Sequence, residues 1–197
     1  MSPLQGNPGK ERGIGKMRVL RLSMQFIAFI MLFIFLACAS TSTKFLDTWK
    51  DETYQGSPEK ILVISTFKDP KIRRLFQDET VKALKDHKVD SVAKYFGLSD
   101  TVPSDKDAIV ALAKEVGADA VLITGPAGTK RVASGDKYLN THTDVYDMKT
   151  NKLISFASAE TQILEDSPDP KHYLDHVPSY AKDLVNNLSQ TGLLPKQ

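Results

Sequence analysis

The sequence predicts a single α/β domain with a mixed sheet, in the order β-α-β-α-β followed by a β-hairpin and a C-terminal helix. Residues 61–67 and 118–124 are short, predominantly apolar runs, which are typical of strands buried on both faces. Residues 139–148 and 153–163 instead alternate apolar and polar side chains around a tight connection at 149–152, which predicts an antiparallel hairpin. Strands that alternate with helices favour parallel neighbours in the first part of the sheet.

The first helix is expected to begin directly after the first strand. Asp69 can cap its free N–H groups, and Pro70 suits its first turn. Apolar residues then recur at helical spacing as far as residues 87–88, which end the helix. Residues 89–95 follow as a weaker strand.

The second helix carries signals at both of its ends. Ser104 with Asp107 three residues later forms a capping-box pattern, and Gly117 suits the C-terminal cap. Ile109, Leu112, Ala113 and Val116 form its buried stripe.

The N-terminus predicts a secretory signal. Basic residues precede an uncharged apolar run at residues 26–37, which is too short for a spanning helix of roughly 20 residues. Phe35-Leu36-Ala37-Cys38 resembles the lipoprotein signal of bacteria, with Cys38 as the lipidated (palmitate-bearing) residue. The alternative is an ordinary cleaved signal, or an uncleaved anchor, with an incidental cysteine. The expected organisation is a signal peptide at 1–37 (with translation starting at Met1 or at Met17), a lipidated tether at 38–58 and an α/β domain at 59–192.

The charge of the chain changes sign once the signal is removed. Residues 1–37 hold five of the 26 basic residues and one of the 24 acidic ones, which leaves the mature part at about −2. This balance argues against a nucleic-acid partner, which requires a basic patch on the folded domain. Cys38 is the only cysteine, so its lipidation leaves no thiol for a disulfide.

The predicted tether contains large apolar residues in an otherwise polar stretch. Phe45, Leu46, Trp49 and Tyr54 either fold back onto the core or contact a protein partner. Phe45 and Trp49 are the candidate partner contacts, because aromatic residues are enriched at interface hot spots.

The mature region resembles a broad set of uncharacterised bacterial lipoproteins. The likeness is carried by residues 44–49, 60–70, 73–74, 117–122 and 145–150. More distantly, the layout is similar to the α/β domains of the curli-secretion lipoprotein, the penicillin-binding-protein activator lipoproteins and the N-terminal domain of the Tol translocation protein. The resemblance implies an interaction or assembly module of the cell envelope, not an enzyme.

Basic residues crowd the expected start of the first helix. Lys68, Arg73 and Arg74 are candidate contacts for an anionic ligand, because helix N-termini favour anions. The segment lacks the glycines of a phosphate-binding loop, so a solvated charged face is the alternative.

Two further motifs are interpreted as structural. His172 and His176 have a spacing that suits a metal, but Pro178 places the start of the closing helix near Asp175 and leaves His172 outside it. This helix is expected to end near Gly192. Residues 125–128 contain two glycines but lack the rest of a phosphate-binding loop, and they are interpreted as a turn.

No catalytic residue, metal site or cofactor is predicted, because no Ser, His and Asp stand in a recognised motif. The leading hypothesis is a non-enzymatic envelope lipoprotein that docks protein partners. It would be anchored to the bilayer through Cys38, and the residues after Cys38 resemble a sorting signal for the periplasmic side of the outer membrane. The alternative is a periplasmic domain that binds or senses a small ligand.

Overall fold

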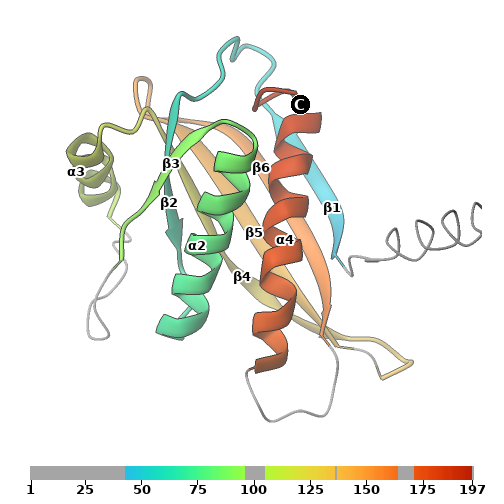
Figure 1. The fold of residues 1–197 in the computed structure, drawn as a ribbon. Helices are drawn as coiled ribbons and strands as arrows, with labels where there is room; N and C mark the ends of the chain where they lie inside the picture. Colours follow the sequence, from blue (N-terminus) through green and yellow to red (C-terminus); the bar gives the residue numbers. More distant parts are fainter. Residues whose placement is uncertain (1–42, 96–104, 136, 164–170, 197) are drawn as a thin grey trace, which may run out of the picture. The chain divides into compact units, whose positions relative to one another are not determined.

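A computed structural model describes residues 43–95, 105–135, 137–163 and 171–196. These residues form one unit containing six strands and three helices, which confirms the predicted α/β class (Figure 1). In chain order the elements are β1 (Thr43–Lys50), β2 (Lys60–Ser65), α2 (Pro70–Asp86), β3 (Asp90–Ala93), α3 (Lys106–Val116), β4 (Ala120–Arg131), β5 (Lys137–Asp147), β6 (Lys152–Ile163) and α4 (Lys171–Gln190).

The six strands form one mixed sheet in the order β1-β6-β5-β4-β2-β3. β2 runs parallel to both β3 and β4, as the β-α-β-α-β pattern predicted. β5 pairs antiparallel with β4 and with β6, and the β5–β6 hairpin is the predicted one. The sheet is therefore parallel at one end and antiparallel at the other.

β2 is buried on both of its faces. Ile61 and Val63 join the core on the side of α2 and α4, whereas Leu62 and Ile64 join the core on the side of α3. All four side chains are fully buried. Burying such a side chain stabilises a fold by about 1.5–3 kcal/mol, so this strand anchors both layers of helices.

Helices α2 and α4 lie side by side on one face of the sheet (Figure 1). Both present apolar residues at helical spacing to that face, as expected for amphipathic helices. The buried members are Phe76, Ala83 and Leu84 of α2, and Val177, Tyr180, Ala181, Leu184, Val185 and Leu188 of α4.

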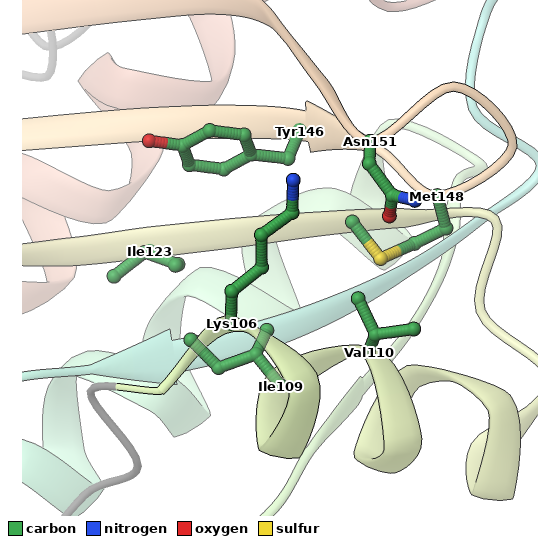
Figure 2. A pocket seen from close by; sticks show the side chains of 7 residues that line it. All are labelled: Lys106, Ile109, Val110, Ile123, Tyr146, Met148 and Asn151. Atoms are coloured by element: carbon green, nitrogen blue, oxygen red, sulfur yellow. The ribbon is translucent and has the colours of Figure 1, made fainter.

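Helix α3 packs on the opposite face, over β2 and β4. Its predicted stripe is the observed contact, and Gly117 caps its C-terminus with a left-handed φ of 67°. The N-terminal cap is Asp105, whose side chain accepts the N–H of Ala108; the predicted cap, Ser104, lies outside the described residues. A cleft remains between α3 and the sheet (Figure 2).

Part of the predicted tether belongs to the sheet. β1 pairs antiparallel with β6, from Thr43 opposite Thr161 to Lys50 opposite Ser155. The pairing is reinforced by the Ser155 hydroxyl, which donates to the carbonyl of Trp49 at 2.8 Å. The expectation that the folded domain begins at residue 59 is therefore corrected, because an edge strand precedes it.

The predicted turn at residues 125–128 is also corrected. These residues lie within β4, which continues to Arg131 through an irregularity in register between Pro126 and Gly128. Gly125 is required by close packing, since a Cβ at this position would come within 1.8 Å of Thr66 Oγ1. Glycine here therefore marks a close approach of two segments and not a change of direction.

Helix α4 begins four residues earlier than predicted. It starts at Lys171, so His172 lies inside it, and Pro178 is an internal residue. A proline inside a helix removes one backbone hydrogen bond, and its ring crowds the carbonyl four residues earlier, which is why the sequence favoured a start near this residue. The packing of Val177 and Tyr180 on either side of it holds the helix against the sheet.

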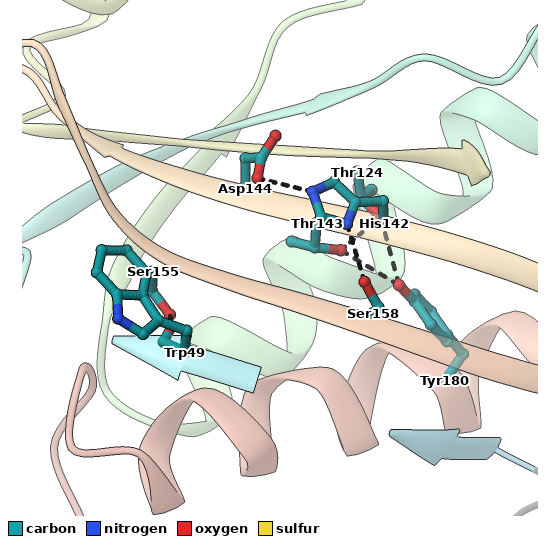
Figure 3. Close-up of polar contacts among 8 residues, drawn as sticks. All are labelled: Trp49, Thr124, His142, Thr143, Asp144, Ser155, Ser158 and Tyr180. Atoms are coloured by element: carbon teal, nitrogen blue, oxygen red, sulfur yellow. Dashed lines mark hydrogen bonds and ion pairs between the residues drawn. The ribbon is translucent and has the colours of Figure 1, made fainter. Parts of the chain in front are cut away.

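A cluster of three buried hydroxyls links α4 to the sheet (Figure 3). Thr143 Oγ1 donates to Thr124 Oγ1 at 2.9 Å. The Tyr180 hydroxyl lies 3.4 Å from Thr124 Oγ1 and 3.3 Å from Thr143 Oγ1. The polar groups of these side chains satisfy one another within an apolar layer.

Candidate functional site

The two faces of the sheet are covered differently. On the side opposite α2 and α4, the core contacts of α3 are with β2, β3, β4 and Met148. No described helix packs on this side of β1, β6 and the middle of β5. We call this surface the open face and define it by five residues: Trp49, His142, Asp144, Phe156 and Ser158.

An aromatic row crosses the open face. Trp49 stacks on Phe156 with a ring-centroid distance of 5.9 Å and an interplanar angle of 26°. The His142 ring lies 5.8 Å from Phe156 on its other side. Trp49 stands directly opposite Phe156 in the pairing of β1 with β6, which explains the contact. The Trp49 side chain is nevertheless 41% exposed, so the row presents a large aromatic surface to solvent.

His142 of this row also belongs to a hydrogen-bonded chain of polar residues (Figure 3). His142 Nε2 is 2.9 Å from Asp144 Oδ1, and His142 Nδ1 is 3.0 Å from Ser158 Oγ. His142 and Ser158 are paired across β5 and β6, and Asp144 is two residues along the same strand as His142. The structure thus brings together a Ser, a His and an Asp that no sequence motif connected.

The surroundings of this chain favour a surface network over a hydrolytic triad. A triad needs N–H donors aimed at the oxyanion of the intermediate. β5 is bonded on both sides, to β4 and to β6, so its backbone groups near His142 are used within the sheet. None of the described clefts is lined by His142, Asp144 or Ser158. The chain instead fixes the orientation of the His142 ring against Phe156.

The two candidate partner contacts point to opposite sides. Phe45 is half-buried against the core of the α2–α4 side, whereas Trp49 belongs to the open face. Between them, β1 shifts register, and Leu46 at this irregularity is 51% exposed. The structure therefore leaves Trp49, and not Phe45, available to a partner.

The three candidate anion contacts are placed in different surroundings. Arg73 is only 7% exposed and donates to the carbonyl of Phe67 at 3.5 Å. The Arg74 guanidinium lies over the ring of Tyr95, 4.5 Å from its centroid. Lys68 is exposed. Two of the three groups are thus engaged with the protein itself.

Cys38 and the predicted signal peptide lie outside the described residues, so lipidation of Cys38 stays a prediction. No helix within the described ranges is long and apolar enough to cross a membrane. The same ranges hold no group of three or more His, Cys, Asp or Glu side chains placed to bind a metal ion.

Comparisons with known proteins assign no family and no function to this chain. No protein-family model matches the sequence, and no curated protein matches it. Among solved structures, the PelC dodecamer of Paraburkholderia phytofirmans is similar with a TM-score of 0.49 and 12% identity, covering 79% of this chain and 99% of that one. Lipoprotein GNA1162 of Neisseria meningitidis has a TM-score of 0.41 and 16% identity, covering 68% and 99% of the two chains. The relationships to curli-secretion, penicillin-binding-protein activator and Tol proteins stay predictions.

Proposed function

We propose that this protein is an envelope lipoprotein anchored through Cys38, and that it acts as a non-enzymatic protein-interaction or assembly module. The observation that carries the proposal is the open face, where an exposed tryptophan stands at the end of an aromatic row. The proposed location is the outer membrane, facing the periplasm.

The open face has the physical properties of a contact surface. Trp supplies a large share of binding energy at many interfaces, because one rigid side chain buries much apolar area. Trp49 is already held in place by its stacking on Phe156, and the Ser155 hydroxyl fixes its backbone. A side chain ordered before binding loses little conformational entropy when a partner arrives.

Site-specific photo-cross-linking in cells tests the proposal. A photoreactive amino acid replaces Trp49 in one strain and Tyr95 in a control strain; both residues are exposed aromatics, and Tyr95 lies beyond β3 at the other end of the sheet. We expect a discrete cross-linked product from position 49 alone. In a third strain, Cys38→Ser is combined with the label at position 49, and the product should decrease because the anchor is removed.

Two outcomes contradict different parts of the proposal. Equal products from positions 49 and 95, or no product from either, argue against the open face as a contact surface. If Cys38→Ser changes neither the cross-linked product nor the fraction of the protein found in membranes, the lipid anchor is contradicted, whereas the open face as a contact surface is not.

A further inference from the structure

The cleft beside α3 is separate from the open face in its residues and in its chemistry. It lies between α3 and the sheet and has a volume of about 270 Å³. This is near the lower end of ordinary ligand pockets, which measure about 300–1,000 Å³. Its lining comes from α3, β4, β5 and the turn after β5, and consists of Lys106, Ile109, Val110, Ile123, Tyr146, Met148 and Asn151.

The walls of the cleft are apolar and firmly placed. Ile109, Ile123 and Met148 are half-buried and pack against the core on the α3 side of the sheet. Val110 completes the α3 wall one residue after Ile109 (Figure 2). The cleft is therefore a recess at the edge of a packed core, with apolar side chains still open to solvent.

Among the described residues that line the cleft, Lys106 is the only charged one. Its side chain rises from the start of α3 and crosses toward β5, so that its ammonium lies between Tyr146 and Asn151 (Figure 2). Within the described parts of the chain, this ammonium has neither a salt bridge nor a hydrogen bond. An unpaired cation above apolar walls is complementary to an anion that carries an apolar group.

Tyr146 and Asn151 add neutral polar groups to the lining, although the Tyr146 hydroxyl points away from the Lys106 ammonium (Figure 2). The Tyr146 hydroxyl has no hydrogen-bond partner among the described residues. Burial, and then the nearby charge of Asp144, raise the pKa of Tyr146, so this hydroxyl keeps its proton at neutral pH and can donate it in a hydrogen bond. Asn151 adopts a left-handed φ of 54° in the turn, and its amide contributes a further donor.

We propose that this cleft binds a small amphipathic monocarboxylate. The apolar part lies between Ile109, Ile123 and Met148, and the carboxylate pairs with the Lys106 ammonium. The volume limits the ligand to a short chain or a single ring. This site gives the small-ligand hypothesis a location at α3, in place of the basic start of α2 predicted from sequence.

Met148 provides a reporter inside the cleft. Of the five methionines in the chain, it is the only one after residue 31. The full-length protein is labelled with ¹³C-methyl methionine and placed in nanodiscs of zwitterionic lipid. The Met148 methyl resonance is then followed by NMR during titration with octanoate, octanol or octylammonium. Partition of a probe into the bilayer is the same for every variant.

The decisive comparison uses two lysines on one helix. Lys106→Gln removes the charge at the cleft, and Lys114→Gln removes an exposed charge in the last turn of α3. We expect octanoate to bind about two- to fivefold more tightly than octanol, as for a solvent-accessible ion pair. This preference should disappear with Lys106→Gln and persist with Lys114→Gln, and octylammonium should bind more weakly than octanol. Val110→Trp, which fills the cleft, should weaken all three probes.

Two results overturn the proposal. One is a Met148 methyl resonance that does not shift with octanoate up to millimolar concentration. The other is an octanoate preference that Lys106→Gln leaves unchanged, or that is absent from the wild type. If Val110→Trp does not fold, the two lysine variants still decide the outcome. None of these results depends on the open face, so the two proposals fail independently.

Discussion

At the scale of single residues, the buried hydroxyls of Thr124, Thr143 and Tyr180 show how polar atoms are accommodated between α4 and the sheet. Each hydroxyl lies within hydrogen-bonding distance of the other two. In an apolar layer, such a cluster fixes the rotation of α4 against β4 and β5, because any displacement would leave a polar group without a partner.

Tyr180→Phe tests this cluster. Removing one hydroxyl should lower the free energy of unfolding by about 0.5–1.5 kcal/mol, the net value of a typical hydrogen bond. The measurement is urea denaturation. Tyr146→Phe is the matched control, since the Tyr146 hydroxyl has no partner among the described residues. A loss from Tyr146→Phe as large as that from Tyr180→Phe would contradict the role given to the cluster.

At the scale of elements, α2 and α3 are capped with different strength. Asp69 Oδ1 accepts two N–H groups, from Lys71 at 2.8 Å and from Ile72 at 3.1 Å. Within the described ranges, Asp105 accepts a single N–H, that of Ala108, at 3.3 Å. Helix α2 also packs against both the sheet and α4, whereas the contacts of α3 with the described parts of the chain are with the sheet.

We expect Asp69→Ala to destabilise the protein more than Asp105→Ala does. The loss for Asp69→Ala should be about 1 kcal/mol, as for other N-cap replacements. Thermal and urea unfolding of the two variants, measured side by side, check the order. Equal losses would mean that the second hydrogen bond of Asp69 contributes nothing to the stability of the fold.

At the scale of the whole molecule, stability is concentrated at one end of the sheet. β2 has helices on both faces and strands on both sides, whereas β1 is an edge strand that has β6 on one side and an exposed tryptophan on the open face. Elements with few buried contacts open locally at lower free energy than core strands.

Hydrogen exchange read by mass spectrometry should reflect this gradient. We expect the amides of β2 and of the first half of β4 to exchange slowest, and those of β1 to exchange earlier. Variants that change only the open face, such as Trp49→Ala, should leave the exchange of β2 unchanged. Slow exchange of β1 at the level of β2 would show that the edge strand is held as firmly as the core.

Much of the fold could be predicted from the sequence, because a strand that is buried on both faces is recognisable as a short apolar run. The run Ile61–Ile64 is apolar at every position since each side chain enters one of the two cores. β1 was missed because its residues are mixed in character and its partner β6 lies more than a hundred residues away. Whether a short polar stretch becomes a strand depends on that distant pairing, not on its own composition.

The open face was only partly predictable for a related reason. Trp49 was a candidate from its residue type alone, but its neighbours depend on the registers of two strand pairs. An irregularity between Val145 and Tyr146 shifts the β5–β6 pairing by one residue. Counting back from the hairpin turn therefore does not place His142 opposite Ser158, and no local pattern signals the shift.

The position of β1 in the chain has a consequence for the order in which the domain folds. β1 precedes every other strand in the chain, yet Thr43 pairs with Thr161, which lies 118 residues further along. β1 therefore stays unpaired until almost all of the domain is available for folding. Until β1 pairs with it, β6 exposes unpaired backbone N–H and C=O groups along its edge. During this interval another copy of the chain can pair with β6 instead. The pairing of β1 with β6 completes the sheet. This last step of folding is therefore the one most sensitive to pairing with other copies of the chain.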